Sequence, residues 1–430
     1  MLVEDLSILK KSFFFTIIGS GPASLSLALD LEEKGFEVSI LEAGAANPTE
    51  FSQDFYKGKV IGNEYFNLDS TRLRCLGGSS QHWGGWSRPL DEHDFYDWPI
   101  NKKDLDPFLN KACKILNIKD NFVDRSITPY FNQINFEFSN VRFKDKYFNY
   151  IKNSKKIFLS LNTPVIKILG DISSAKSLNI FYQNKLFLNL KVKNLILGCG
   201  GLENSRILLW SQESSDSDFL KNFNIGNFWM EHPHHEVGAF VGDYLSVKKM
   251  FNLNMAKNNE IFFSPSLSLI KKHNIKNCSL RFQYQFDRES IYNLLNDLKC
   301  NGNKYVKRML KSFRTDRLCS FRVRSVWEQP GYLQNCIKLS KNLKDFFGVP
   351  QIELYWKKRR IEKKSPLILL NELGKYFANL DKGRIGILNY LNEDNDVFPK
   401  TSEPGGHHHM GGTRIGYNFD KKDLVDINLR

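Results

Sequence analysis

The first forty residues alternate between short apolar runs and polar turns, which predicts a strand, a helix and a second strand. Residues 13–18 are mostly aromatic and β-branched, and this favours a short buried strand. A glycine-containing turn follows, and the helix after it begins near Pro22 and ends before Gly35. Residues 36–41 are apolar again and predict the second strand. The apolar face of the helix consists of Leu25, Leu27, Ala28, Leu29 and Leu31.

The turn between this strand and this helix has the spacing of a nucleotide-binding turn. Gly19 permits the tight turn, and Gly21 lets the backbone approach a pyrophosphate at the positive end of the helix. Ser24, at the third position of the pattern, is small enough for close helix–strand packing. Glu42 lies 21 residues after Gly21, where a carboxylate accepts from a ribose hydroxyl. We interpret the segment as a dinucleotide-binding βαβ unit; the alternative is a glycine-rich turn in an ordinary α/β protein.

The middle of the chain predicts further elements that would extend this unit. Residues 101–118 have the periodicity of an amphipathic helix. A strand at residues 194–197 runs into the glycine-rich stretch 198–201 and then into a helix around residues 204–210. Before that strand, short strands at residues 157–159, 165–169, 178–182 and 186–192 predict a β-meander that ends in the strand 194–197.

The pattern of predicted strands and helices changes over residues 238–404, and this predicts a second domain. Predicted strands at 279–286, 320–327, 337–339 and 351–356 surround predicted helices at 291–313 and 363–380. We therefore expect an α/β fold: a Rossmann-type cofactor-binding domain with a β-meander over residues 1–237 and 405–430, and an inserted α+β substrate domain at 238–404. The aromatic residues Phe282, Tyr284, Phe321 and Trp327 could stack on a sugar, but a core role is the simpler interpretation.

Two clusters of glycine, histidine and aromatic residues are the candidates for chemistry. Residues 74–86 hold four glycines, which permit a close approach of the backbone to a flat ligand, together with His82 and tryptophans; the alternative is a structural turn. Residues 405–416 contain three adjacent histidines between glycines. Metal binding is disfavoured there because successive side chains of an extended segment point to opposite faces and no acidic or cysteine ligand accompanies them. A histidine is instead suited to accept an alcohol proton.

Composition narrows the class of protein. With 430 residues and 41% hydrophobic content, the chain can form two domains with large cores. The net charge of +14 is spread along the chain, so it suits an anionic cofactor or substrate better than nucleic acid, for which no motif is present. The seven cysteines form no C-x-x-C pair, so a reducing, cytoplasmic setting is expected. The N-terminus lacks the order of a signal peptide, and no membrane span is expected.

With these motifs in view, the chain resembles the glucose–methanol–choline (GMC) family of flavoprotein oxidoreductases, and within it the bacterial sugar and sugar-acid dehydrogenase and pyranose oxidase branches. The resemblance extends over essentially the whole chain and depends on six places in the family's order. They are Gly19–Pro22 with Glu42, residues 76–80 with 82–85, Asp94-Phe95 with 98–100, residues 195–209, Ile225-Gly226 with His232-Pro233, and residues 408–416 with Val425-Asp426.

The resemblance implies bound FAD, with its diphosphate on the Gly19–Gly21 turn, its ribose on Glu42 and its isoalloxazine along residues 76–85. His408 matches the family's active-site histidine by its distance from residues 414–416, and His409 and His407 are close alternatives. His82 falls where several members form a covalent histidyl–flavin bond, the alternative being a noncovalent contact. The implied cofactor contacts are Gly19, Gly21, Pro22, Ala23, Ser24, Glu42, Arg74, Gly77, Gly78, Ser79, Ser80, His82, Trp83, Gly84, Val165, Gly198 and Gly200.

Members of the family normally continue for a few dozen residues past the stretch that matches Val425-Asp426, with a further flavin-contacting strand and a second catalytic His or Asn. The resemblance therefore leaves three alternatives for this chain. It is a truncated frame that is inactive alone, its missing segment comes from a partner chain, or it binds flavin without turnover. Apolar surface left exposed by a missing segment predicts poor solubility.

The leading interpretation is an FAD-dependent oxidoreductase. It would oxidise a CH–OH group of a sugar, polyol or related alcohol by hydride transfer to flavin, while a histidine accepts the proton. A catalytically inactive flavin-binding remnant or subunit is the first alternative. A nicotinamide-dependent dehydrogenase is a weaker one, which the 76–85 loop and the His408 motif disfavour. Oxygen, a quinone and another protein are the alternatives for the electron acceptor.

Overall fold

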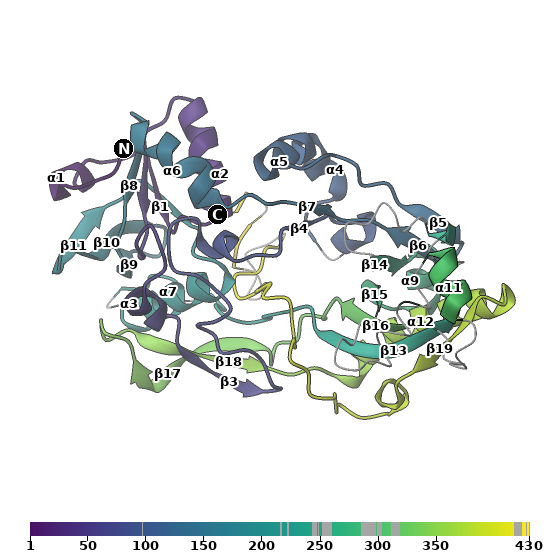
Figure 1. Ribbon diagram of the computed structural model, residues 1–430. Helices are drawn as coiled ribbons and strands as arrows, with labels where there is room; N and C mark the ends of the chain where they lie inside the picture. Colours follow the sequence, from purple (N-terminus) through teal and green to yellow (C-terminus); the bar gives the residue numbers. More distant parts are fainter. Residues whose placement is uncertain are drawn as a thin grey trace.

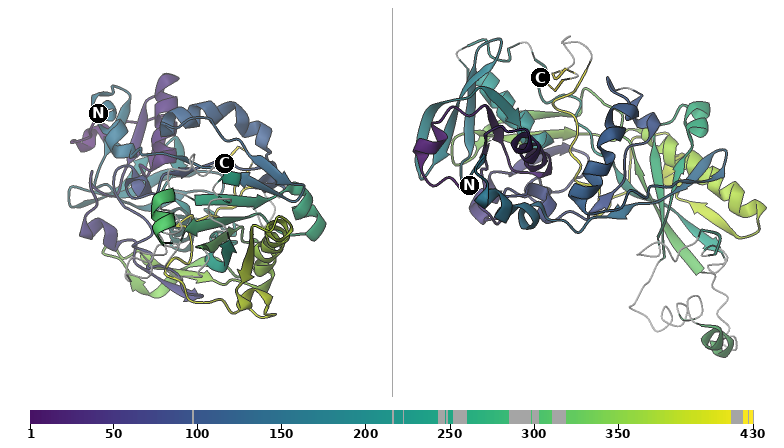
Figure 2. Two further views of the ribbon diagram at one scale, coloured as in Figure 1. Left: turned by 45° about the vertical axis from the view of Figure 1, so that its right-hand side comes forward. Right: turned by 90° about the horizontal axis from the view of Figure 1, so that it is seen from above.

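The computed structural model describes the chain except at residues 97, 216, 222, 243–246, 248, 252–259, 285–297, 299–302, 311–318, 417–423, 427 and 430. A parallel sheet lies at one end of the molecule and a large antiparallel sheet at the other (Figure 1). Figure 2 shows the molecule turned by 45° about the vertical axis and, in its right-hand view, the same two ends from above. The segments that the sequence nominates for cofactor binding lie at the parallel end.

The parallel sheet has the strand order β12-β1-β2-β8. Helix α2 (Pro22–Glu33) joins β1 to β2 and packs against the sheet. The predicted strand–turn–helix–strand unit is thus confirmed. Strand β2 is buried along its whole length, which explains why its sequence is a continuous apolar run rather than an alternating one. The four strands are β1 (Phe15–Ile18), β2 (Val38–Leu41), β8 (Ile157–Ser160) and β12 (Asn194–Leu197).

A three-stranded antiparallel meander follows β8 in the chain, and it lacks the first and the last of the predicted strands. Residues 157–159 form β8, which pairs in parallel with β2, and residues 194–197 form β12, which pairs in parallel with β1, so both predictions are wrong as part of the meander. A short apolar run does not reveal which sheet a strand joins, and the first of these runs is buried on both faces. The meander consists of β9 (Val165–Gly170), β10 (Ala175–Tyr182) and β11 (Lys185–Lys191).

Helix α7 (Gly201–Glu213) leaves β12 and packs between the meander and a second small sheet. That small sheet has the order β17-β18-β3. It pairs a strand from early in the chain with two strands from the predicted inserted domain. The three strands are β3 (Gly58–Gly62), β17 (Cys336–Lys344) and β18 (Pro350–Trp356).

The large sheet has seven strands in the order β19-β13-β16-β15-β14-β6-β5, and helix α12 (Lys364–Asn379) packs on it. Phe282, Phe321 and Trp327 are almost completely buried in its core, which confirms the core interpretation for these three; the side chain of Tyr284 lies outside the described residues. The strands are β5 (Arg125–Thr128), β6 (Phe131–Ile134), β13 (His234–Gly242), β14 (Glu260–Pro265), β15 (Cys278–Tyr284), β16 (Cys319–Trp327) and β19 (Gly383–Ile387).

Shorter elements complete the described chain. The amphipathic helix predicted at residues 101–118 is confirmed as α4, η3 and α5 in succession. Of the helix predicted at 291–313, α11 lies in the described part and most of the rest lies outside it. The shorter helices and strands of the described chain are α1 (Leu6–Leu9), α3 (Glu50–Asp54), η1 (Gly78–Gln81), β4 (Trp86–Ser87), η2 (Glu92–Phe95), α4 (Lys102–Leu105), η3 (Asp106–Phe108), α5 (Leu109–Leu116), β7 (Glu137–Phe138), α6 (Phe143–Asn153), α9 (Leu267–His273), α11 (Lys304–Leu310), η5 (Arg360–Lys363) and η6 (Asn389–Asn392).

Two of the sheets connect segments from both sides of residue 238. Strands β5 and β6 join the large sheet, and β17 and β18 join β3. The domain division at residues 237/238 and 404/405 stays a prediction. None of the helices in the described part of the chain has the length and apolar character needed to cross a lipid bilayer. Free thiols are present at Cys75, Cys113, Cys199, Cys278 and Cys336, while Cys300 and the side chain of Cys319 lie outside the described residues.

Candidate active site

A cavity of about 440 Å³ lies at the carboxyl ends of β1 and β12, which are neighbours in the parallel sheet. Each strand runs into a short glycine turn and then into a helix: residues 19–21 lead to α2, and residues 198–200 lead to α7. Helix α2 packs against β1, β2 and β8, whereas α7 packs against β9, β17 and β18. The chain thus leaves two adjacent strands in different directions, and such a switch point is where α/β sheets bind ligands.

The two glycine turns are in contact, and the steric surroundings of their glycines differ. Gly19 has a φ of +91°, and a Cβ atom there would lie 2.7 Å from the carbonyl oxygen of Gly198. Gly200 has a φ of +83°, but a Cβ atom there would meet no atom within 4 Å. Close packing therefore requires the first glycine, while the second borders open space. The backbone N–H groups of both helix starts remain available to an anion in that space.

Glu42, at the end of β2, is tied to the first turn. Its carboxylate is buried and accepts hydrogen bonds from the N–H (2.9 Å) and hydroxyl (2.5 Å) of Ser20 and from the N–H of Gly44 (2.8 Å). Burial raises the pKa of this carboxyl, against the lowering effect of these donors and of Arg74. Glu42 lines the cavity, as predicted, and its contact with a ribose stays a prediction.

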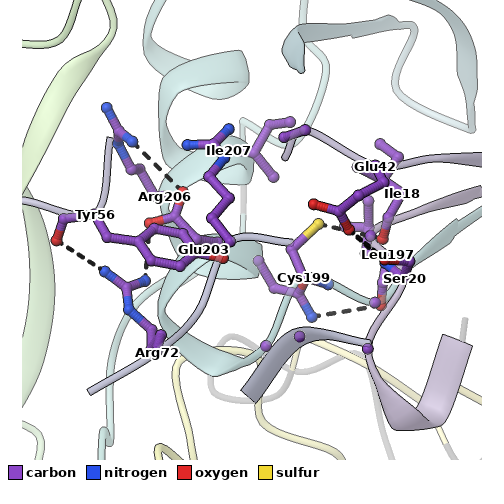
Figure 3. A pocket seen from close by; sticks show the side chains of 18 of the residues that line it. Ile18, Ser20, Glu42, Tyr56, Arg72, Leu197, Cys199, Glu203, Arg206 and Ile207 are labelled. Atoms are coloured by element: carbon purple, nitrogen blue, oxygen red, sulfur yellow. Dashed lines mark hydrogen bonds and ion pairs between the residues drawn. The ribbon is translucent and has the colours of Figure 1, made fainter. Parts of the chain in front are cut away.

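Buried ion pairs form the side of the cavity that Figure 3 shows around Arg206. Arg72 Nη1 lies 2.9 Å from Glu203 Oε1, and Arg206 Nη2 lies 2.7 Å from Asp345 Oδ2. Burial alone would raise the pKa of the Glu203 carboxyl, but the guanidinium groups of Arg206 and Arg72 outweigh it and hold this pKa below its usual value. None of these four residues is predicted from the sequence as a catalytic or cofactor-binding residue. The i, i+3 spacing of Glu203 and Arg206, which places both on one face of a predicted helix, is the only sequence feature that indicates an ion pair here.

Arg74 is the cation in this wall with unused hydrogen-bonding capacity. Its guanidinium carbon lies 4.7 Å from the ring centre of Phe55, and the residue lines the cavity. The Nη1 atom is buried and has no hydrogen-bond partner among the described residues. A buried donor without a partner is costly, so an acceptor on a ligand fits this position.

Two of the three adjacent histidines also line the cavity. His407 and His409 face it, and His408 does not. His407 Nε2 and His409 Nδ1 are both buried and lack a hydrogen-bond partner among the described residues. The Thr71 hydroxyl donates to the Leu68 carbonyl at 2.9 Å, so it accepts from His409 Nε2–H at 3.1 Å. The neutral His409 ring therefore has its lone pair on Nδ1, inside the cavity.

His408 points away from the cavity, toward a short chain of imidazoles. Its Nδ1 lies 2.5 Å from His232 Nε2, and His232 Nδ1 lies 3.0 Å from His234 Nε2. Burial lowers the pKa of His232 to about 3, so this ring is neutral at pH 7. His234 was not nominated by the sequence, and His232 entered only as part of a motif. No group of three or more His, Cys, Asp or Glu side chains in the described ranges is arranged to hold a metal ion.

Besides His407, the structure brings twelve of the nominated residues to the cavity wall and leaves seven outside the lining. Ser80 Oγ donates to the Gly77 carbonyl at 2.6 Å, and Trp83 Nε1 donates to the Val141 carbonyl at 2.9 Å, so both support the loop from behind. The lining set is Gly19, Gly21, Pro22, Ala23, Glu42, Arg74, Gly78, Ser79, Val165, Gly198, Gly200 and His409. The set outside the lining is Ser24, Gly77, Ser80, His82, Trp83, Gly84 and His408.

Comparison with known proteins supports the fold. No protein-family model matches the sequence, and no curated protein does. The structure of pyridoxine 4-oxidase from Mesorbium loti is similar to this chain with a TM-score of 0.56 and 12% identity over 97% of this chain and 92% of that one. A structure of Aspergillus oryzae formate oxidase, studied for the effect of a mutation on FAD modification, is similar with a TM-score of 0.54 and 15% identity over 97% and 91%. The expected fold class, a Rossmann-type domain combined with an α+β region, is confirmed.

Proposed function

We propose that this chain is an FAD-dependent oxidoreductase of the GMC type that oxidises the CH–OH group of a sugar, polyol or related small alcohol. The observation that carries the proposal is the cavity between two chemically different walls. One wall consists of paired glycine turns at helix N-termini, and the other presents two neutral imidazoles with unpartnered nitrogen atoms.

The chain's own residues fit a flavin dinucleotide. Gly21 and Gly200, with the first residues of α2 and α7, offer backbone N–H groups and helix dipoles to a pyrophosphate, whereas the other N–H groups of the two turns donate within the protein. Open space beside Gly200 leaves room for the approach, and Arg74 Nη1 needs an acceptor. Bound FAD would supply the two-electron acceptor for a hydride. The two similar structures are named as oxidases, and one is described with an FAD modification, which supports the proposal.

The protein's chemical task is then to hold the alcohol and to accept its hydroxyl proton. Burial lowers the pKa of both His407 and His409, so each ring is neutral at pH 7 and can accept a proton. His409 was nominated by its motif, and its place in the cavity supports that role. The motif also nominated His408, whose ring lies outside the cavity in this structure.

The first experiment asks whether the purified protein binds flavin and whether an alcohol reduces it. We expect a yellow protein whose visible absorption bleaches, without air, when one of a panel of sugars, polyols and simple alcohols is added. Arg74→Met should weaken FAD binding, and Arg360→Met, at a surface ion pair, should not. A protein that stays colourless after incubation with FAD would contradict the proposal. A yellow protein that no alcohol bleaches would favour the second candidate, a flavin-binding remnant or partner-dependent subunit.

A covalent bond between His82 and the flavin is a separate proposal. The His82 ring is half-buried and lies outside the cavity lining, with its centre 6.5 Å from that of His407, which lines the cavity. Intact mass after acid denaturation is the measurement. Added mass equal to FAD, absent from His82→Asn, supports the bond; no added mass rejects it and leaves noncovalent binding intact.

A further inference from the structure

Two arginines lie side by side on the large sheet, on the face that is turned away from its core. Arg281 on β15 is directly opposite Arg324 on β16 in the strand register. Their neighbours along the strands, Phe282 and Val323, are fully buried in the core that α12 shares, so the two arginines belong to the other face. Like charges directly opposite each other destabilise an antiparallel pair. A local rule broken in this way is expected at a functional site.

Aromatic rings fix the first of these guanidinium groups. The guanidinium carbon of Arg281 lies 4.9 Å from the ring centre of Trp86, at the end of the glycine-rich loop 74–86, and 5.9 Å from that of Phe262 on β14. The two rings meet edge-on, with centres 5.2 Å apart. Strand β4, which contains Trp86, lies between the parallel end of the molecule and the large sheet (Figure 1). Arg281 is therefore held where the loop meets the sheet.

The second guanidinium group holds a carboxylate of the protein itself. Arg324 Nη1 lies 2.6 Å from Glu403 Oε2. The Arg324 side chain is 17% exposed and that of Glu403 is 55% exposed, so the arginine is shielded while its partner extends into solvent. An ion pair with so exposed a member contributes little to stability. Because a guanidinium has five N–H donors in a planar fork, Arg324 can bind the oxyanion of a ligand beside Glu403 or in its place.

The arginine pair lies close to the histidines around the cavity. Burial lowers the pKa of His407, which lines the cavity, and the carboxylate of Glu403 is among the charges that oppose this lowering. Burial also lowers the pKa of His234 well below its usual value, and both guanidinium groups lower it further. Water and salt screen charges beyond about 10 Å, so such effects act over short distances. The pair therefore borders both the cavity and the imidazole chain beside it.

We propose that Arg281 and Arg324 form an oxyanion-binding subsite, and that the substrate is an alcohol with an anionic end group, a carboxylate or a phosphate. This inference depends on the proposed function and specifies its substrate class. The end group binds between the two guanidinium groups while the CH–OH group lies in the cavity. Glu403 competes with the end group for Arg324. Both arginines determine specificity, and neither takes part in the transfer of the hydride or the proton.

Electrostatics favours an anionic alcohol over a neutral one at this place. The chain has a net charge of +14, which attracts anions to its surface. A hydrogen bond between a guanidinium and a carboxylate or phosphate is roughly twice as strong as one between neutral groups. A bound oxyanion also reduces the repulsion between the two guanidinium groups, which a hydroxyl group does not. The gain therefore falls on the anionic member of any set of otherwise similar alcohols.

The first test compares alcohols that differ only in their end group. Flavin reduction in the holoprotein is followed without air, with glycerate, glycerol 3-phosphate and glycerol as one set and gluconate, sorbitol 6-phosphate and sorbitol as the other. In the set that reacts, kcat/KM should be at least about 10-fold higher for an anionic member than for the neutral one, and added salt should reduce the difference. The preferred anion tells a carboxylate from a phosphate substrate. A neutral member that reacts as well as its anionic counterparts overturns the inference.

The second test asks whether the arginines cause the preference. Arg281→Met should lower kcat/KM for the anionic alcohol about 10- to 100-fold, mainly through KM, and leave the neutral alcohol unchanged. Arg384→Met removes the same charge from an exposed ion pair on the same sheet and should change neither rate. The ratio of the two rates is diagnostic, because a folding defect lowers both. An unchanged ratio in Arg281→Met overturns the inference.

The third test should improve binding. Glu403→Gln removes the competing carboxylate, so KM for the anionic alcohol should fall by up to about 5-fold while KM for the neutral alcohol stays the same. Calorimetric titration of the holoprotein with gluconate and with sorbitol measures the preference without turnover. If no alcohol bleaches the flavin, the proposed function is contradicted and the titration alone decides on the subsite. Tighter binding of gluconate that Arg281→Met abolishes supports it, and gluconate binding no tighter than that of sorbitol overturns it.

Discussion

The cavity has two walls that are built by different physical means. The glycine wall, residues 19–21 and 198–200, follows from two local strand–turn–helix units whose strands are neighbours in one sheet. The histidine wall, His407 and His409, is held by polar groups that lie far away in the sequence, including Tyr65, Thr71 and Glu231. The glycine wall is therefore formed by backbone geometry and supported by the buried charges of Glu42 and Arg206, whereas the histidine wall depends on buried polar side chains from distant segments. The two walls should respond differently to substitution and to pH.

The largest expected effect tests how far the glycine wall depends on buried charge. Arg206, on α7, lies 2.7 Å from Asp345 and donates to the carbonyl of Pro350 at 2.8 Å, so it fixes the helix that follows the second turn. Arg206→Met leaves the Asp345 carboxylate buried without its cation and should lower the free energy of unfolding by about 3–5 kcal/mol. Urea unfolding measures the change.

A double variant provides the matched control. Asp345 Oδ1 accepts from the N–H groups of Phe347 and Val349, and Asp345→Asn keeps that acceptor while removing the charge. Arg206→Met with Asp345→Asn should therefore recover part of the lost stability. If the single Arg206→Met variant were as stable as the wild type, the glycine wall would depend on backbone geometry alone and the contrast between the walls would be sharper.

The next prediction isolates close packing within the glycine wall. Gly19 and Gly200 both have positive φ, but only Gly19 has the partner turn within clashing distance. Gly200→Ala should cost about 1–2 kcal/mol for the backbone conformation. Gly19→Ala should cost about 1–3 kcal/mol more, because the added methyl group overpacks the contact with Gly198. Equal urea-unfolding free energies for the two variants would mean that the turns do not support each other.

Acid sensitivity between pH 6.5 and 5 should belong to the histidine wall, because Glu203 on α7, whose pKa is held below its usual value, loses stabilisation only at lower pH. Burial lowers the pKa of His232 to about 3, so the folded state keeps the ring neutral while the unfolded chain takes up a proton below its ordinary pKa near 6.5. Stability is therefore unaffected above pH 6.5 and falls as the pH drops toward 3. Between pH 6.5 and 5 the loss from His232 alone is about 1.5 kcal/mol. His234 and His409, whose pKa values burial also lowers, add to it in the same direction.

Hydrogen exchange at pH 7 and pH 5 would locate that loss. Amides of residues 228–234 and 404–412 should lose protection first, and those of β1 and β2 should follow only on global unfolding. His232→Asn should reduce the pH dependence. Simultaneous loss of protection in both walls would show that they unfold as one unit.

The glycine wall was predictable because its signal is local. Gly19, Gly21 and Glu42 occur in the order that a βαβ unit imposes, and Gly198 and Gly200 repeat the strand–glycine–helix order near the middle of the chain. Each segment carries its own periodicity, and parallel pairing then places the two turns together. The errors in this region, assigning residues 157–159 and 194–197 to the meander, arose because pairing partners are not encoded in a short apolar run.

The histidine wall was only partly predictable. The run of three histidines was visible, and alternation along an extended segment correctly implied that neighbouring rings point to opposite sides. Which ring faces the cavity depends on the segment 405–409, which has two residues more than the segment 231–233 that it faces, and on the left-handed φ of His407. Both are consequences of long-range contacts. No local pattern marks Glu231 or Tyr65, so the supports of this wall could not be nominated.

The smallest expected effect concerns a single hydrogen bond of the histidine wall. The Thr71 side chain is buried and holds the His409 ring by accepting from its Nε2–H. Thr71→Val is nearly isosteric but leaves this N–H without a partner, while the Leu68 carbonyl still accepts from Arg72 Nε at 3.3 Å, so we expect a loss of about 1 kcal/mol in unfolding free energy. Thr71→Ser keeps the hydroxyl and is the control. If Thr71→Val also changes the visible spectrum of bound FAD while Gly200→Ala does not, His409 lies against the flavin. An unchanged spectrum in both would place the flavin away from this ring and leave His407 as the histidine nearest the chemistry.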